Sequence, residues 1–361
     1  MNIVYDHQIF GWQKYGGISR YFYELANRVV LAEGFSASII APLHVSSYLA
    51  GGAVPVRGIQ VPKVRNSGRI LSALNGLVSP PFIRRAMPDL LHETYYSRRT
   101  LAPKGCPKVL TVFDMTHEKF PGSFLSRDDT SEIKRTAVKR AERVICISEN
   151  TRSDLIEILD IPIEKTAVVH LGFTLTADKA TLPSPGKPFL LYVGPRGAYK
   201  NFGMLLEAYA SSTALRIAFD LIAFGGGPFS QTERDDIRSR GLADSVTQKS
   251  GDDSVLAALY SEAAAFVYPS LYEGFGIPLL EAMSFDCPVV CSNTSSIPEV
   301  AGNAACYFEP EDADSIRTAI ESVVFSSSLR DELVQLGRER IGHFSWNRTA
   351  METMTIYEEM Q

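Results

Sequence analysis

The sequence lacks the features that identify several large classes of protein. No apolar run reaches the roughly 18 residues that a membrane-spanning helix needs, so we expect no such helix. The five cysteines form no Cys-x-x-Cys pair, which argues against a disulfide framework and against a zinc site. The chain begins in an apolar, strand-like run without a basic leader, so we expect no secretory signal. These absences favour a cytoplasmic protein with free thiols.

The chain also lacks an excess of positive charge. Its 36 Lys and Arg residues face 41 Asp and Glu residues, which gives a net charge of −5 and argues against a nucleic-acid partner. The cations are unevenly spread, however: eight lie between Arg57 and Arg99, where the acids are Asp89 and Glu93. Because apolar residues lie among them, this Arg57–Arg99 basic region fits peripheral contact with an anionic membrane or an anionic acceptor; a solvated face explains it equally well.

Length and pattern predict two α/β domains with doubly wound parallel sheets. A chain of 361 residues corresponds to two domains, and short apolar runs alternate with longer amphipathic ones. We expect a Rossmann-like domain over 1–175, a proline-rich linker over 176–188, a second Rossmann-like domain over 189–343 and a terminal helix over 344–361 that crosses back to the first domain. The expected strands are Asn2–Tyr5, Ala37–Ala41, Leu90–His92, Val109–Phe113, Val144–Ile147, Ala167–His170, Phe189–Val193, Phe219–Phe224, Ser245–Gln248, Ala265–Tyr268, Val289–Cys291 and Cys306–Phe308.

The most informative segment covers residues 268–281, Tyr-Pro-Ser-Leu-Tyr-Glu-Gly-Phe-Gly-Ile-Pro-Leu-Leu-Glu. A buried strand is expected to lead into a loop, and a helix to begin at the second proline. Gly274 and Gly276 allow backbone N–H groups to approach a ligand closely, and the start of the helix suits a diphosphate. Glu273 and Glu281 then surround one anion site, where carboxylates are suited to bind hydroxyl groups. Taken alone, Glu281 would only complement the helix dipole.

This segment resembles the retaining GT-B glycosyltransferases of family 4. The family pattern Glu-Gly-Phe-Gly-x-Pro-x-x-Glu is met at each of its positions from Glu273 to Glu281. By this resemblance, Glu273 faces the hydroxyls of the donor sugar, while Gly274, Phe275 and Gly276 contact the donor and Glu281 holds the ribose hydroxyls. The resemblance covers nearly the whole chain.

A second candidate lies in Gly194-Pro-Arg-Gly-Ala-Tyr-Lys, after an expected strand. Arg196 and Lys200 follow the strand end, and two cations are suited to stabilise a pyrophosphate leaving group without a metal. The resemblance agrees, because family members place an Arg and a Lys here on the diphosphate. The alternative is a pair of surface cations.

Two further candidates lie in the first domain. Gly16 and Gly17 form a glycine pair at an expected strand-to-helix turn, which permits close approach to phosphate or sugar but also fits a plain turn. His117 follows an expected strand end, and Asp114 precedes it. A lone histidine is more often structural than catalytic, but the resemblance places this segment, and the glycine loop, at the reaction centre.

The sequence does not indicate a metal site. The motif Asp312-Ala-Asp314 opens an expected helix after a polar loop instead of ending a buried strand. We therefore interpret Asp312 as a helix cap. Ser148 is likewise expected to cap a helix first.

Together these features predict a retaining, metal-independent hexosyltransferase. The resemblance implies an acceptor-binding first domain and a nucleotide-sugar-binding second domain with the donor in the cleft between them. Glu273, His117, Arg196 and Lys200 form the expected catalytic set. Segments such as Tyr15-Gly-Gly-Ile-Ser-Arg resemble bacterial mannosyltransferases that build surface polysaccharide such as O-antigen, which favours GDP-mannose as donor, with no other cofactor. The implied acceptor is a glycan or a lipid-linked glycan at the inner face of the cell membrane.

Two alternatives remain open. A sugar-nucleotide 2-epimerase shares the fold and would form an isomeric free nucleotide sugar. A non-catalytic partner subunit would keep the fold, but it should have lost some of the four charged residues Glu273, Glu281, Arg196 and Lys200.

Overall fold

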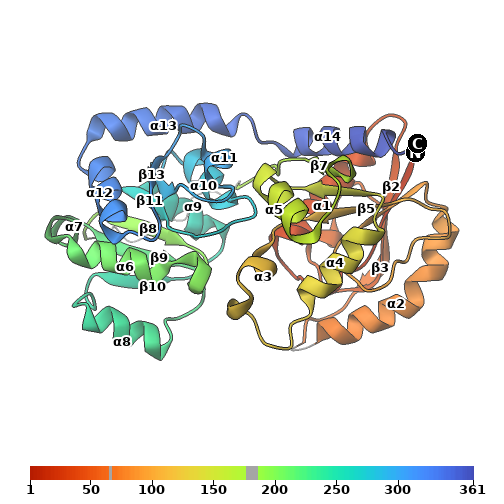
Figure 1. The fold of residues 1–361 in the computed structure, drawn as a ribbon, viewed down its shortest axis with the longest axis horizontal. Coiled ribbons are helices and arrows are strands. Elements are labelled where there is room, and N and C mark those ends of the chain that lie inside the picture. Colours follow the sequence, from red (N-terminus) through yellow and green to blue (C-terminus); the bar gives the residue numbers. More distant parts are fainter. Residues whose placement is uncertain (65–66, 176–185) are drawn as a thin grey trace. The chain divides into compact units, whose positions relative to one another are not determined.

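The computed structural model describes residues 1–64, 67–175 and 186–361. They divide into two compact units: unit 1 comprises Met1–Gly172 and Trp346–Gln361, and unit 2 comprises Phe173–Ser345 (Figure 1). Most of the linker expected over 176–188 lies outside the described residues.

Unit 1 contains a parallel sheet flanked by helices. Among the described residues the sheet has seven strands in the order β3-β2-β1-β4-β5-β6-β7. Its strands are β1 (Asn2–Tyr5), β2 (Ser36–His44), β3 (Val56–Gln60), β4 (Leu90–Glu93), β5 (Lys108–Val112), β6 (Arg143–Cys146) and β7 (Thr166–Val168). Its helices are α1 (Gly17–Val29), α2 (Ser67–Ala86), α3 (Thr116–Lys119), α4 (Thr130–Arg140), α5 (Glu149–Leu159) and α14 (Trp346–Glu358).

Unit 2 repeats the same plan. Its described residues form a six-stranded parallel sheet in the order β10-β9-β8-β11-β12-β13. Its strands are β8 (Phe189–Val193), β9 (Asp220–Phe224), β10 (Val246–Lys249), β11 (Ala265–Tyr268), β12 (Val289–Ser292) and β13 (Cys306–Phe308). Its helices are α6 (Phe202–Ser211), α7 (Thr213–Ala218), α8 (Gln231–Ser239), α9 (Asp253–Glu262), α10 (Ile277–Ser284), α11 (Ile297–Ala301), α12 (Ala313–Val324) and α13 (Ser327–Ile341).

The order of each sheet creates one position where a ligand is expected. In unit 1 the chain winds outward from β1 through β2 and β3, then returns to place β4 on the other side of β1. In unit 2 it does the same around β8, with β11 on the other side. Loops that leave two such neighbouring strands diverge, and the crevice at their carboxyl ends is where doubly wound sheets bind ligands. The β1/β4 and β8/β11 loops are therefore the places to examine.

Helix α14 closes the core of unit 1. It packs against α1, and its Tyr357 is fully buried. The hydroxyl of Tyr357 lies 2.6 Å from Nδ1 of His92, whose Nε2 lies 2.9 Å from the hydroxyl of Thr111. His92 is completely buried at the end of β4, so its two ring nitrogens have structural partners.

The expected strands coincide with observed ones within a few residues, and both expected caps are confirmed. Ser148 accepts a hydrogen bond from the backbone N–H of Thr151 at the start of α5, and Asp312 accepts from those of Asp314 and Ser315 at the start of α12.

The Arg57–Arg99 basic region contains two elements that the sequence analysis missed, strand β3 and the 20-residue helix α2. Pro80 and Pro81 lie inside α2, where proline normally interrupts the hydrogen-bond pattern of a helix. Asn75 anchors α2 to β2, since its amide accepts from the N–H of Leu43 at 2.9 Å and donates to the carbonyl of Leu43 at 2.8 Å.

The burial of His92 predicts a loss of stability in acid. Burial lowers the pKa of His92 from about 6.5 to about 3. The unfolded chain therefore binds more protons than the folded protein between these values, so this contribution is complete above pH 6.5 and is lost as the pH falls towards 3. We expect the free energy of unfolding to fall by up to about 1.4 kcal/mol per pH unit in this window because of His92.

Urea unfolding of the wild type and of His92→Gln across this window measures the effect. The difference between the two proteins should shrink as the pH falls. His343→Gln removes an exposed histidine and serves as the control. Parallel pH profiles for the wild type and His92→Gln would contradict the assignment.

Candidate functional site

The β8/β11 crevice brings together a lysine and a glutamate that are 73 residues apart in the sequence. Nζ of Lys200 lies 2.6 Å from Oε1 and 2.8 Å from Oε2 of Glu273. Only 14% of the lysine side chain and 11% of the glutamate side chain are exposed. The two loops are also joined by their backbones, because the N–H of Leu271 donates to the carbonyl of Tyr199 at 2.8 Å. The strand order thus places a cation and a carboxylate at one point.

Two serines that follow β12 hold the loop that contains Glu273. The hydroxyls of Ser295 and Ser296 donate to the carbonyl of Glu273 at 2.7 and 2.9 Å. Ser296 also lies 2.9 Å from the carbonyl of Phe275. Ser295 adopts a left-handed backbone, with φ of 58°. The sequence analysis missed both serines, and only their place directly after β12 could have drawn attention to them.

Helix α10 begins where the expected diphosphate seat lies. Gly276 precedes the helix with φ of 114°, a conformation that side chains strongly disfavour, and Pro278 lies in the first turn. Gly276, in the N-cap position, has no side chain that could cap this end. Glu281 lies further along α10, half-buried, and its Oε2 accepts a hydrogen bond of 3.3 Å from the buried hydroxyl of Tyr260. Burial, and then the nearby charge of Glu281, raise the pKa of Tyr260 well above its usual range.

Arg196 lies in the loop after β8, but its side chain is turned into the protein. Only 4% of it is exposed, and Nε lies 2.6 Å from Oε1 of Glu233. The other guanidinium nitrogens donate to the carbonyls of Gly225, Gly227 and Pro228 at 2.8, 3.0 and 3.4 Å. Burial opposes ionisation of Glu233, but the bonds from Arg196 and Ser230 outweigh it, and the pKa of Glu233 is lowered. In this state Arg196 organises the neighbouring loop.

That loop is a run of three glycines after β9 that the sequence analysis overlooked. Gly225, Gly226 and Gly227 all have positive φ, at 86°, 66° and 71°. A methyl group on Gly226 would lie 2.7 Å from the guanidinium of Arg196 and 3.2 Å from the carbonyl of Gly194. Three adjacent glycines after a strand were a readable signal for this turn.

His117 occupies α3 of unit 1. Its ring stacks on Phe124, with the centroids 3.8 Å apart, and Nε2 lies 3.9 Å from Oδ2 of Asp128. About a fifth of the side chain is exposed. The segment is anchored by the buried Lys134, whose Nζ donates to the carbonyl of Asp114 at 2.8 Å and to Glu118 at 2.7 Å.

The glycine pair of unit 1 forms the start of α1. Gly16 precedes the helix in an extended conformation, and a side chain there would collide with Gln13. The side-chain oxygen of Gln13 accepts the N–H of Ser19 at 3.0 Å, which satisfies one of the open donors of the helix. Gly17 has open space where a side chain would lie.

The β1/β4 crevice of unit 1 contains a cavity of about 480 Å³. Trp12, Tyr95 and Tyr96 provide aromatic surface, and the remaining lining residues are mostly polar. Aromatic faces combined with convergent polar groups are typical of small-molecule sites. The lining residues are Gln8, Trp12, Arg69, Ser72, Tyr95, Tyr96, Ser97, Arg98, Asp128, Asp129, Thr130 and Ile133.

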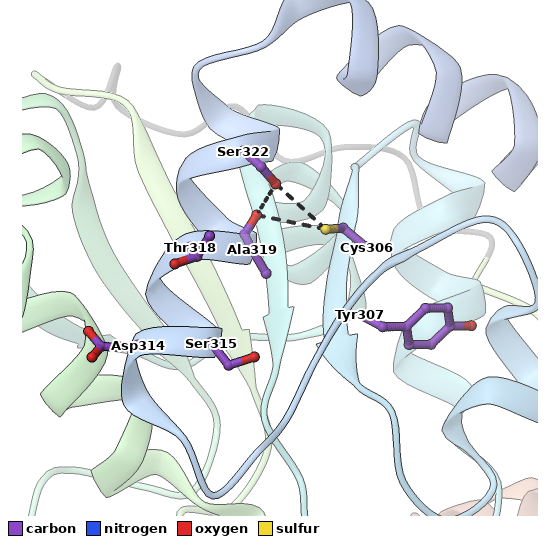
Figure 2. A pocket seen from close by; sticks show the side chains of 7 residues that line it. All are labelled: Cys306, Tyr307, Asp314, Ser315, Thr318, Ala319 and Ser322. Carbon is purple, nitrogen blue, oxygen red and sulfur yellow. Dashed lines mark hydrogen bonds between the residues drawn. The ribbon is translucent and has the colours of Figure 1, made fainter.

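Unit 2 also has a hollow, which lies away from the expected site residues. It lies between β13 and α12 (Figure 2). Its volume is about 440 Å³. It is lined by small side chains such as Ser315, Thr318 and Ser322, and the sulfur of Cys306 lies 3.6 Å from the hydroxyl of Ser322. None of the expected site residues lines it. In the described part of the chain, His, Cys, Asp and Glu form no group of three or more that could hold a metal ion.

The expected residues therefore fall into two sets. Unit 2 brings Lys200 and Glu273 into direct contact and places Gly274, Phe275, Gly276 and Glu281 in the same loop and helix; Arg196 starts from the same strand end but points to the glycine loop. Unit 1 holds the expected residues Gly16, Gly17 and His117.

Comparison with known proteins connects this geometry to a family. The chain matches the model Glycosyltransferase Family 4 over residues 15–176 and the model Glycosyl transferases group 1 over residues 175–340. It is 27% identical to O-antigen chain mannosyltransferase B of Escherichia coli over an alignment of 369 positions, which covers 95% of this chain and 96% of that protein.

Two solved structures show the same fold. The sucrose-phosphate synthase of Thermosynechococcus elongatus aligns with a TM-score of 0.75 at 19% identity, covering 99% of this chain and 98% of that one. Alr3699/HepE of Anabaena in complex with UDP and glucose aligns with a TM-score of 0.74 at 17% identity, covering 99% of both chains.

The glycine loop offers a test of how Arg196 is held. Gly226→Ala places a methyl group against the guanidinium and imposes a left-handed backbone on alanine, so we expect a loss of roughly 1–2 kcal/mol or more in the free energy of unfolding. Gly203→Ala is the matched control, because Gly203 lies exposed in α6 with open space around it. That change should be neutral or stabilising by up to about 1 kcal/mol. Equal effects of the two changes in chemical unfolding would contradict this account of the loop.

Proposed function

The chain belongs to glycosyltransferase family 4 and has the GT-B fold, with two parallel-sheet α/β domains, and we propose that it is a retaining mannosyltransferase of O-antigen-type polysaccharide synthesis. The donor would be GDP-mannose, used without a metal ion. The acceptor would be a glycan or a lipid-linked glycan at the inner face of the cell membrane.

The observation that carries this proposal is the Lys200–Glu273 pair beside the start of α10. A largely buried cation, a carboxylate and a helix N-terminus with glycine in the N-cap position lie at one strand-order switch point. The N-terminal N–H groups and the lysine suit a diphosphate, and a carboxylate suits sugar hydroxyls. Glu281, further along α10, would accept hydrogen bonds from the ribose hydroxyls.

In the structure, both proposed phosphate cations are paired with carboxylates. Lys200 is bound to Glu273, and Arg196 to Glu233. A diphosphate that enters would replace Glu273 as the partner of Lys200 and release that carboxylate to the donor sugar. Arg196 makes four hydrogen bonds to the protein out of its five N–H donors. Arg196 would therefore contribute to the diphosphate site mainly by holding the glycine loop in place. For this reason, Arg196→Ala would also disturb folding.

The proposed reaction needs no nucleophile from the protein. The bond between the anomeric carbon and the diphosphate oxygen breaks, and the acceptor hydroxyl attacks from the same face of the sugar. Its proton passes to the departing diphosphate, which balances the charge. Lys200, Arg196 and the start of α10 would stabilise the negative charge that develops on the leaving group. Glu273 would orient the sugar.

The donor is inferred from relatives. O-antigen chain mannosyltransferase B of Escherichia coli spans nearly the same length as this chain, which supports mannose as the sugar. Alr3699/HepE is bound to UDP and glucose in its structure, so the base of the donor is the part of the proposal that most needs measurement.

The cavity of unit 1 is the proposed acceptor site. Trp12, Tyr95 and Tyr96 provide aromatic surface on which the C–H face of a sugar ring packs. Arg98 and Asp129 at its rim are ion-paired at 2.8 Å, and such charged and polar groups suit a ring of hydroxyls. A glycan is therefore a better occupant than a purely apolar molecule.

A thermal-shift panel tests the donor. The wild type is heated with GDP, UDP, ADP and TDP and their common sugars in EDTA. A ligand at a hundredfold excess over its dissociation constant adds about 2.7 kcal/mol to the free energy of unfolding. We expect GDP and GDP-mannose to stabilise the protein and Glu281→Ala to lose most of this shift, with Glu262→Ala on α9 as the control. Stabilisation by UDP alone would replace the donor, and no shift with any nucleotide would favour a non-catalytic partner subunit.

Substitution of Lys200 tests its proposed role in stabilising the charge of the leaving group. In Lys200→Ala we expect the kcat for release of GDP from GDP-mannose, in the presence of mannosyl oligosaccharides, to fall by roughly 10²–10³-fold, the usual effect of removing one group that stabilises transition-state charge. Lys187→Ala in unit 2 removes a lysine that also lies near a carboxylate, Asp220 at 3.4 Å, and should leave kcat unchanged. Unchanged kcat in Lys200→Ala would refute the role of this cation. Formation of an isomeric nucleotide sugar without acceptor would instead identify an epimerase.

A further inference from the structure

Gln8 is a buried polar residue in the wall of the unit 1 cavity. It lies just after β1, at the carboxyl end of that strand, and only 6% of it is exposed. Its side-chain nitrogen donates to Oδ2 of Asp6 at 2.7 Å. Its side-chain oxygen has no hydrogen-bond partner among the described residues. A polar atom in such a place is satisfied by whatever enters the cavity.

Asp6 determines which end of the Gln8 amide faces the cavity. Asp6 is completely buried, and its Oδ1 accepts from the N–H of Thr94 at 3.0 Å, from the hydroxyl of Thr94 at 2.7 Å and from the N–H of Gln8 at 3.2 Å. The two ends of an amide have nearly the same shape, so its hydrogen-bond partners decide how it is turned. An ionised carboxylate only accepts, so the nitrogen of Gln8 faces Asp6 and the oxygen is left for the cavity.

The charged residues of the wall indicate which kind of ligand suits this oxygen. They are two cations and two anions: Arg69, Arg98, Asp128 and Asp129. Asp129 lies 2.8 Å from Arg98, and Oδ1 of Asp128 accepts from the N–H of Thr130 at 2.9 Å. Because these charges cancel, a neutral ligand fits the cavity better than an anion or a cation.

We propose that Gln8 binds a hydroxyl group of a neutral sugar in this cavity, and that Asp6 is the positioning residue that keeps the amide oxygen of Gln8 turned towards it. The hydroxyl donates, because an amide oxygen only accepts. A sugar that lacks this O–H leaves the oxygen of Gln8 unpaired and binds more weakly. The cavity therefore selects sugars with a free hydroxyl at one position.

The assignment deepens the proposed function and rests on it for identifying the sugar as the acceptor. In the proposed reaction the attacking hydroxyl passes its proton to the departing diphosphate, so that proton is not shared with Gln8. The hydroxyl at Gln8 is therefore a different one on the acceptor. Gln8 decides which acceptor is bound and takes no part in proton transfer. An acceptor whose recognised hydroxyl already carries a branch would be excluded.

Tryptophan fluorescence measures binding to the cavity in the absence of any nucleotide. The chain has two tryptophans; Trp12 lines the cavity and Trp346 is buried elsewhere in unit 1. The probes are methyl α-mannoside and its monodeoxyfluoro derivatives, in each of which fluorine replaces one hydroxyl and cannot donate. We expect one derivative to bind the wild type roughly tenfold more weakly than the parent sugar, which corresponds to the loss of one hydrogen bond.

Two substitutions separate the roles of Gln8 and Asp6. Gln8→Met keeps the length of the side chain but removes the amide, so it should weaken binding of the parent sugar roughly tenfold and abolish the discrimination against that derivative. Asp6→Asn keeps an acceptor for Thr94 but presents an NH₂ group to Gln8, which turns the amide so that its nitrogen faces the cavity. The same derivative should then bind several-fold more tightly than it binds the wild type, a gain that damage to the fold does not produce.

Gln60→Met is the matched control, because Gln60 is an exposed residue of β3 outside the cavity wall. It should bind every probe like the wild type. Equal binding of the parent sugar by Gln8→Met and the wild type, or no binding by the wild type, would overturn the proposal. No gain for the fluorinated derivative in Asp6→Asn would overturn the role of Asp6. The thermal shift by nucleotides needs no acceptor sugar, so failure at Gln8 and failure of the proposed function are distinguishable.

Discussion

The pairing of Lys200 with Glu273 depends on the strand order of unit 2, and the proposed chemistry depends on that pair. A largely buried ammonium group without a partner costs several kcal/mol, so Lys200 needs a nearby anion. Glu273 supplies it at 2.6 Å. The same reasoning applies to Arg196 and Glu233. In the proposed reaction, binding of a diphosphate would be an exchange of anions, and the displaced carboxylate of Glu273 would bind the donor sugar.

The two cations differ in how freely they take part in this exchange. Lys200 has one carboxylate partner, and its flexible stem allows Nζ to move. The planar guanidinium of Arg196 is fixed by the backbone carbonyls of the glycine loop as well as by Glu233. Moving it would leave several buried carbonyls without donors, which is costly. We therefore interpret Lys200 as the mobile charge of the site and Arg196 as the group that fixes the shape around it.

Parts of this structure follow from sequence because they depend on local pattern. Buried parallel strands are continuous apolar runs, and β1, β8, β11 and β13 have the expected bounds. The Glu-Gly-Phe-Gly segment predicted a turn and a helix start, both of which depend on glycine and proline. The partners of Arg196 and the serines below Glu273 come from other loops, and no periodicity reveals them. Helix α2 was missed because its prolines, its buried Asn75 and Ser79, and its exposed aliphatic side chains all oppose the usual helix pattern.

The reversed polarity of α2 also concerns the proposed acceptor cavity, because Arg69 and Ser72 of this helix line it. A helix that buries asparagine and exposes leucine is stabilised by an anchor such as the Asn75–Leu43 bonds, so the apolar face is not needed for the core. The neighbouring cavity of unit 1 would bind a short stretch of glycan weakly, through its aromatic residues. Weak, aromatic-lined binding also allows a product that is one sugar longer to leave.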